Sequence, residues 1–221
     1  MVEPLYYEIA INTTLTLLNM FVERGIPVNY INLDYDEIQA VARDSRALRS
    51  GLTNGQLVAK SINQIVKAIK QVHPNITILF WDDMLDPWHL HDPQSDQDNF
   101  QAQHFGREDG TLDNAMALVE DKDIVWLNWF YDYPYSNMRI NGSFTKTWKD
   151  GFRVIGCPNE DFENMQCYGK SLTVAPDQKG LGLMDTDWDG KYLGVVRTAS
   201  IGWHYIPNAT LNCEESPFPP A

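Results

Sequence analysis

Five short apolar runs in this chain are each followed at once by acidic or other polar side chains. The runs are rich in β-branched and aromatic residues, and each is shorter than an ordinary helix, so we predict five strands. The predicted strands are Val28–Leu33, Ile76–Trp81, Ile124–Trp129, Phe152–Ile155 and Leu181–Met184. Runs that are apolar almost throughout are typical of parallel sheets, which are covered on both faces.

Helix patterns separate these strands. The spacing of apolar residues predicts helices over residues 12–24, 57–72, 112–119 and 192–203. The first pattern stops at Gly25-Ile26-Pro27, and the second follows Thr53-Asn54-Gly55-Gln56, which has the form of a capping box. Strands that alternate with helices predict an α/β fold with a parallel sheet and right-handed crossovers.

Composition narrows the class of protein. With 221 residues, 43% of them hydrophobic, the chain has enough apolar material for one folded domain over residues 1–221. Its 30 acidic and 17 basic residues give a net charge of −13, which argues against a nucleic-acid partner. The longest apolar runs fall far short of the roughly 20 residues of a membrane-spanning helix, so no membrane span is expected.

Signals of cellular location are mixed. The first residues include Glu3 and Glu8 and do not read as a secretory signal. Four N-x-S/T sequons favour a secreted or endomembrane, lysosome-like glycoprotein; they lie at Asn12, Asn75, Asn141 and Asn208. A disulfide between Cys157 and Cys167 and a set of three free thiols, with Cys213, remain equally open.

The polar residues after the predicted strands should meet. Parallel strands end at one edge of a sheet, and in α/β barrels that edge carries the active site. Acidic residues also favour turns and helix N-termini, but tryptophans there have no capping role. The residues that we expect to gather at this edge are Asp34, Asp36, Glu37, Trp81, Asp82, Trp129, Trp188 and Asp189.

Aromatic planes beside carboxylates suit a carbohydrate substrate, because a sugar ring has an apolar face and hydroxyls that bind acids. Glycoside hydrolysis also needs a proton donor and a group that stabilises the anomeric carbon. Asp36 and Glu37 are the leading pair. Neighbouring residues of a regular strand point to opposite sides, so both can serve one site only where the strand has curled into its loop.

The segment Ile31-Asn32-Leu33-Asp34-Tyr35-Asp36-Glu37-Ile38 resembles the Asp-Glu signature after the fourth barrel strand of the glycoside hydrolase family 20 β-N-acetylhexosaminidases. Ile78–Asp83 is similar to that family's fifth-strand Trp segment, and Ile124–Trp129 to its sixth strand. Gly182–Asp189 resembles the eighth strand, which carries a sugar-stacking Trp. The resemblance covers residues from about 10 to 205.

This resemblance implies a TIM-type (β/α) barrel that hydrolyses N-acetylhexosamine-type β-glycosides. Glu37 would be the general acid/base, and Asp36 would orient the substrate's own 2-acetamido group, which acts as nucleophile. Trp81, Trp129 and Trp188 would wall the pocket, where Asp34, Asp82 and Asp189 would also bind substrate. It implies no metal and no cofactor.

Two local departures from the family stand out. The family usually has two glycines where this chain has Asp34 and Tyr35. In that family the seventh strand leads into a Tyr that binds the acetamido carbonyl. This chain has no Tyr in the corresponding segment, Cys157-Pro158-Asn159-Glu160, and Tyr168 lies further along.

The predicted strands match only strands four to eight of the barrel. Strands one to three, with the family's sugar-binding Arg, have no counterpart, so we expect the C-terminal part of a longer barrel, a truncated product or a divergent partial barrel. Such a piece could be inactive alone, and its open sheet edge would favour self-association.

Two other functions remain open. A carbohydrate-binding protein could keep the tryptophans after losing catalysis. A metal-dependent hydrolase could use His89 and His91 with the aspartates at the strand ends, although the segment Trp88–Asp92 reads more readily as a solvated loop.

Overall fold

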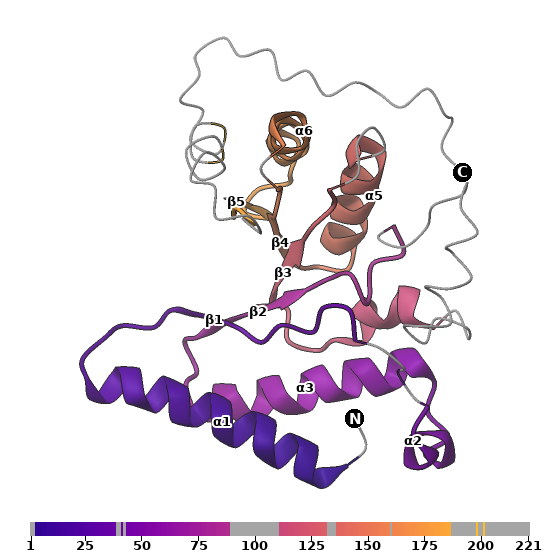
Figure 1. Ribbon diagram of the computed structural model, residues 1–221. Coiled ribbons are helices and arrows are strands. Elements are labelled where there is room, and N and C mark those ends of the chain that lie inside the picture. Colours follow the sequence, from indigo (N-terminus) through magenta and orange to yellow (C-terminus); the bar gives the residue numbers. More distant parts are fainter. Residues whose placement is uncertain are drawn as a thin grey trace. The chain divides into compact units, whose positions relative to one another are not determined.

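The computed structural model places five strands and six helices along the described part of the chain (Figure 1). It describes residues 3–38, 41, 43–88, 111–131, 136–159, 161–186, 198 and 201. Within these residues, no helix is both long and apolar enough to cross a membrane.

The strands form a parallel sheet in the order β1-β2-β3-β4-β5, which is also their order along the chain. They are β1 Tyr30–Asn32, β2 Thr77–Trp81, β3 Val125–Asn128, β4 Arg153–Gly156 and β5 Gly180–Leu183. Each lies within one of the predicted runs or differs from it by one residue. The prediction of an α/β fold with a parallel sheet is therefore confirmed.

Helices alternate with these strands. They are α1 Pro4–Glu23, α2 Ser45–Arg49, α3 Asn54–Val72, the 3₁₀ helix η1 Leu112–Leu118, α5 Ser136–Lys149 and α6 Phe162–Thr173. Helix α1 begins eight residues before its predicted start at Asn12, and α2, α5 and α6 were not predicted. Most of the helix predicted over 192–203 lies outside the described residues.

The chain divides into two compact units. Unit 1 comprises Met1–Phe80 and Met84–Ile124, and unit 2 comprises Trp81–Asp83 and Val125–Ala221.

Unit 1 is organised around α3. The capping box predicted at its start is confirmed, because the Gln56 amide donates to Thr53 Oγ1 at 3.2 Å and the Thr53 amide donates to Gln56 Oε1 at 3.0 Å. Nine residues along one stripe of α3 are buried, as its amphipathic pattern predicts. Gly55 admits η1 at close range, since an added Cβ would lie 2.3 Å from the Thr111 carbonyl oxygen.

Unit 2 is built on β3, whose four residues are all buried. The Trp126 ring meets Phe152 edge-on, with ring centroids 5.8 Å apart. Helices α5 and α6 pack against each other, α5 against β3 and β4, and α6 against β5. The ring of Phe144 on α5 lies against Tyr168 of α6, with centroids 5.9 Å apart. This packing brings polar side chains of both helices to the carboxyl ends of the strands.

Candidate functional site

The loop after β1 contains the predicted catalytic pair. Strand β1 ends at Asn32, and the backbone then becomes left-handed at Asp34 (φ 60°), Tyr35 (φ 79°) and Glu37 (φ 43°). Non-glycine residues rarely adopt this conformation, so three of them within four positions make a strained turn. The Asp34 amide donates to Asn32 Oδ1 at 3.0 Å, which closes the start of the turn.

Tyr35 holds this strained turn in place. Its side chain is 9% exposed, and its hydroxyl hydrogen-bonds to the hydroxyls of Ser61 and of Tyr6, the latter at 2.9 Å. The ring meets Phe80 edge-on, with centroids 5.3 Å apart. Burial, the main cause, raises the pKa of Tyr35 far above its usual value, so its hydroxyl stays protonated. These contacts offset the cost of a positive φ at a bulky residue.

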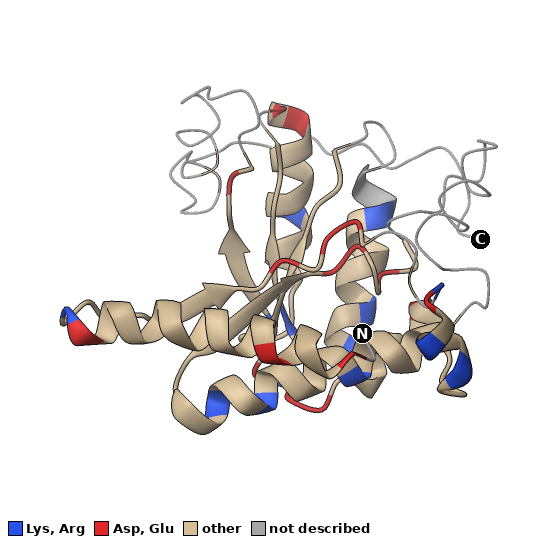
Figure 2. Ribbon diagram, turned by 60° about the horizontal axis from the view of Figure 1, so that its bottom comes forward, with Lys and Arg blue, Asp and Glu red and all other residues tan. Residues whose placement is uncertain are grey.

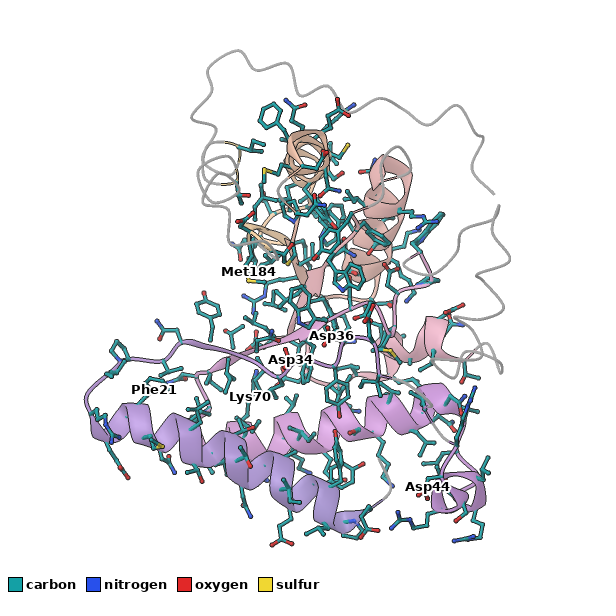
Figure 3. All side chains as sticks on the ribbon, viewed as in Figure 1. Phe21, Asp34, Asp36, Asp44, Lys70 and Met184 are labelled. Atoms are coloured by element: carbon teal, nitrogen blue, oxygen red, sulfur yellow. The ribbon has the colours of Figure 1, made fainter. Side chains whose placement is uncertain are left out.

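With Tyr35 directed into the core, the acidic residues around it stay outside. Asp34, Asp36 and Glu37 are all exposed, and Asp34 and Asp36 are labelled in Figure 3. Asp36 and Glu37 lie beyond the end of β1, so the alternation of a regular strand does not separate them. The curled geometry that the pair requires is present in unit 1.

Unit 2 holds a buried polar network centred on Asn128, the last residue of β3. Its amide nitrogen donates to Asp82 Oδ2 at 2.8 Å and to Ser143 Oγ at 2.6 Å. Its amide oxygen accepts from the Tyr168 hydroxyl at 3.1 Å. All four residues are 0% exposed. The bonds on both ends of the amide fix its orientation, and they hold the Asp82 carboxylate beside the end of β3.

A glycine at the end of β4 makes room for the Tyr168 ring. A Cβ added at Gly156 would lie 2.5 Å from Tyr168 Cδ1, closer than real Cβ contacts come. Burial, and secondarily the nearby Cys157 and Asp82 groups, raise the pKa of Tyr168 well above its usual value. Tyr168 therefore remains a hydrogen-bond donor at neutral pH.

Cys157 lies beside this network and is a free, fully buried thiol. Burial is the main cause that raises its pKa, and the charge of Asp82 adds to it. Cys157 is free whereas Cys167 is disulfide-bonded, so the expected Cys157–Cys167 bridge and the expected set of three free thiols are both wrong. Helix geometry disfavours the bridge: α6 directs Tyr168 toward the end of β4, and the adjacent Cys167 projects about 100° away around the helix.

These buried groups predict a loss of stability in alkali. Cys157 and Tyr168 ionise near 9.0 and 10.0 in an unfolded chain but keep their protons when folded. Above about pH 9 the folded state binds more protons, so the free energy of unfolding falls as pH rises toward the folded pKa values. Urea unfolding between about pH 7 and about pH 11 measures this fall. In Cys157→Ala we expect it to begin about one pH unit later; an unchanged profile would contradict the burial of the thiol.

The predicted aromatic residues are described only in part. Trp81 ends β2 and Trp129 follows β3; both are half-buried in unit 2. The Trp129 ring lies against Tyr131, with centroids 5.1 Å apart and planes inclined by 32°. Several predicted residues lie outside the described residues: Trp188 and Asp189 of the sugar site, and His89, His91 and Asp92 of the alternative metal site.

The sequence interpretation included Asp82 but missed Asn128 and Ser143, and it noted Tyr168 only as a departure from the family. The sequence did contain a signal for Asn128, which is a polar residue at the end of an otherwise apolar strand. Such a side chain is costly to bury unless it is hydrogen-bonded, so its position predicts polar partners nearby. Ser143 and Tyr168 lie on helices that were not predicted, so nothing in the sequence connected them to the strand ends.

No group of three or more His, Cys, Asp or Glu side chains that could hold a metal ion is found among the described residues. Comparisons of the chain with protein-family models, with curated proteins and with solved structures give no match.

Proposed function

We propose that this protein is a glycoside hydrolase acting on N-acetylhexosamine-type β-glycosides, with catalysis assisted by the substrate's acetamido group. The strained turn after β1 is the observation that carries the proposal. Asp34 and Tyr35 occupy the positions where family 20 enzymes usually have two glycines, and both adopt the left-handed backbone that glycine favours. The two residues that follow are the exposed acids Asp36 and Glu37.

The sheet supports a barrel origin for the chain. Its strand order never reverses, whereas doubly wound α/β sheets reverse their order at a switch point. A (β/α) barrel is wound by right-handed crossovers between successive neighbouring strands, and the strand order of this sheet is compatible with that winding. We propose that β1 to β5 correspond to strands four to eight of such a barrel.

In the proposed mechanism, Glu37 protonates the glycosidic oxygen as the bond to the anomeric carbon breaks. The carbonyl oxygen of the 2-acetamido group attacks that carbon and forms a cyclic intermediate, while the Asp36 carboxylate orients and polarises the acetamido N–H. Glu37, now ionised, then takes a proton from the water that opens the ring. The same residue serves as acid and as base in turn.

The remaining predicted residues would bind the sugar. Trp81, Trp129 and Trp188 would offer apolar faces, and Asp34 and Asp189 would accept from hydroxyls. Asp82 is fully buried and accepts from Asn128. Within this proposal it positions the strand ends behind the pocket wall.

A secretory location also remains our proposal. The sequon residues Asn12, Asn75 and Asn141 are exposed, and Cys167 is disulfide-bonded, as oxidising compartments allow. If the native protein follows this route, treatment with a peptide N-glycanase will lower its mass. An unchanged mass would argue against it.

The proposal is tested by release of nitrophenol from 4-nitrophenyl N-acetyl-β-hexosaminides, compared with the matching β-glucoside. We expect the glucoside to react at least about 100-fold more slowly, because it lacks the internal nucleophile. Binding of N-acetylhexosamine without any release would favour the carbohydrate-binding alternative. Equal rates on both substrates would contradict catalysis assisted by the acetamido group.

A further inference from the structure

A groove runs along α3, between this helix and the end of η1. Its volume is about 490 Å³, and all of its lining residues belong to unit 1. Six of them come from α3, and the other two are Leu118 and Glu120. None of the eight is part of the predicted sugar site, and none is the asparagine of an N-x-S/T sequon. The groove is therefore a feature distinct from the turn after β1.

Asn63 joins the two walls of this groove. Its amide nitrogen donates to the Leu118 carbonyl at 3.0 Å, and its amide oxygen accepts from the Glu120 backbone amide at 2.9 Å. Both polar ends of the side chain thus connect α3 to the segment that ends η1. Because the walls are held by the fold itself, a ligand meets a preformed surface and does not have to order it.

Two lysines of α3 line the groove. Lys60 and Lys67 are both exposed, and neither forms an ion pair in the described part of the chain. Lys70 differs from them, because it pairs with Asp121 at 2.8 Å. Figure 2 shows the lysines of α3 in blue. In a chain with 30 acidic and 17 basic residues, two unpaired lysines in one groove make a local site for anionic groups.

The spacing of these lysines matches that of acidic residues in an extended peptide. Seven residues of an α-helix rise about 10 Å, so Lys60 and Lys67 lie two turns apart on one stripe. A polyproline II segment has three residues per turn, so acids at every third position lie on one side, about 9 Å apart. The α3 wall from Gln56 to Lys67 is about 16 Å long, which is the length of about five such residues.

The other lining groups suit a peptide better than a polymer that is anionic on every side. Gln56 Oε1 accepts from the Thr53 amide at 3.0 Å, which leaves its amide nitrogen to donate to a peptide carbonyl. The Leu118 side chain, 48% exposed, offers an apolar contact. Glu120 is exposed on the same wall, and its carboxylate would repel a sulfated or phosphorylated polymer. A peptide can keep its acids on the opposite side, facing α3.

We propose that this groove binds an extended acidic peptide segment of a partner protein, with acidic side chains at every third position facing Lys60 and Lys67. The contact is short, and exposed ion pairs contribute little each. The complex therefore belongs with weak, transient interactions, and its dissociation constant should lie between about 10 and about 500 µM.

Fluorescence anisotropy of the full chain with a labelled peptide of four Glu-Pro-Pro repeats tests this inference. We expect saturable binding, and a dissociation constant at least about tenfold higher for Lys60→Glu/Lys67→Glu, because attraction becomes repulsion at both positions. Lys149→Glu/Lys170→Glu is the matched control, since it changes the net charge equally at two exposed lysines of unit 2. It should raise the dissociation constant less than about twofold.

A peptide of four Lys-Pro-Pro repeats separates the groove from long-range attraction. It should bind Lys60→Glu/Lys67→Glu at least about fivefold more tightly than the control variant, although both variants have the same net charge. That binding also shows that the groove variant is folded.

Four results would overturn the proposal. They are no binding of the acidic peptide up to about 1 mM, equal weakening by the two double variants, equal affinity of both variants for the basic peptide, and displacement of the acidic peptide by a heparin fragment or inorganic phosphate at concentrations below its own dissociation constant. The last result would assign the groove to a different anion. None of these measurements depends on glycosidase activity.

Discussion

Glu37→Gln is expected to lower kcat for an N-acetyl-β-hexosaminide by about 10²–10⁴-fold, with KM nearly unchanged. The amide keeps the shape of the side chain but can neither donate the carboxylic proton nor take one from water. The loss should be greater for an unactivated disaccharide than for the nitrophenyl substrate, because nitrophenolate leaves with little need of protonation. Steady-state kinetics on both substrates measure this difference.

Glu120→Gln provides the control for this experiment. Glu120 is exposed in unit 1, after η1, and the same change of charge and shape there should leave kcat unaltered. Equal activity of Glu37→Gln and the wild-type protein would remove Glu37 from the acid/base role. A loss of the same size on both substrates would indicate that Glu37 does not protonate the leaving group.

Asn128→Ala is expected to lower the free energy of unfolding by about 3–5 kcal/mol. The substitution removes the donor to the buried Asp82 carboxylate and to Ser143, and the acceptor of the Tyr168 hydroxyl. Burying these groups without partners is costly. Tyr168→Phe removes only the hydroxyl at one edge of this network, so it should cost less, about 1–3 kcal/mol. Urea unfolding at neutral pH, with the slope m compared between variants, measures both changes.

Asn114→Ala is the matched control, because Asn114 is exposed on η1 and its backbone amide, which the substitution keeps, donates to the Thr111 carbonyl at 3.4 Å. It should change stability by less than about 0.5 kcal/mol. A double-mutant cycle with Asp82→Ala then isolates the Asn128–Asp82 interaction. Strictly additive losses in that cycle would show that the two side chains are not coupled.

The helices and strands in which apolar residues stand out clearly from polar neighbours could be predicted from the sequence. In α3, apolar residues recur at helical spacing after a Thr53–Gln56 capping box, and the structure has the same boundaries to within a few residues. The strands were equally clear, since each is a compact apolar run between polar turns. Helix α1 was found only from residue 12 because Leu5 and Ile9 occupy its outer side, so no amphipathic contrast marks its first turns.

Helices α5 and α6 were missed because their sequences are weak helix formers. Helix α5 contains Gly142 together with Thr, Ser and Asn residues, and α6 contains Gly169. Packing against the sheet and against each other stabilises them. Residue Asp44 before α2 has two roles: it pairs with Arg46, and it caps α2 by accepting from the Arg46 amide at 2.7 Å.

Some residues of the candidate site could likewise be predicted from the sequence, and others could not. Asp36 and Glu37 could be identified because acidic residues directly after an apolar run are visible in the sequence. The network around Asn128 could not, because it joins a strand end to residues of α5 and α6, and the spacing along the chain does not show such contacts. The left-handed turn was also hidden, since a bulky residue such as Tyr35 does not normally adopt this backbone conformation.

One end of the described sheet is formed by an irregular strand, β5. Strand β5 contains Gly180 and Gly182, the latter at φ 133°, and its pairing with β4 shifts register between Val154 and Ile155. Irregular, glycine-containing terminal strands are poor templates for adding another strand. Addition of a strand at β5 would therefore require its irregular backbone to straighten first.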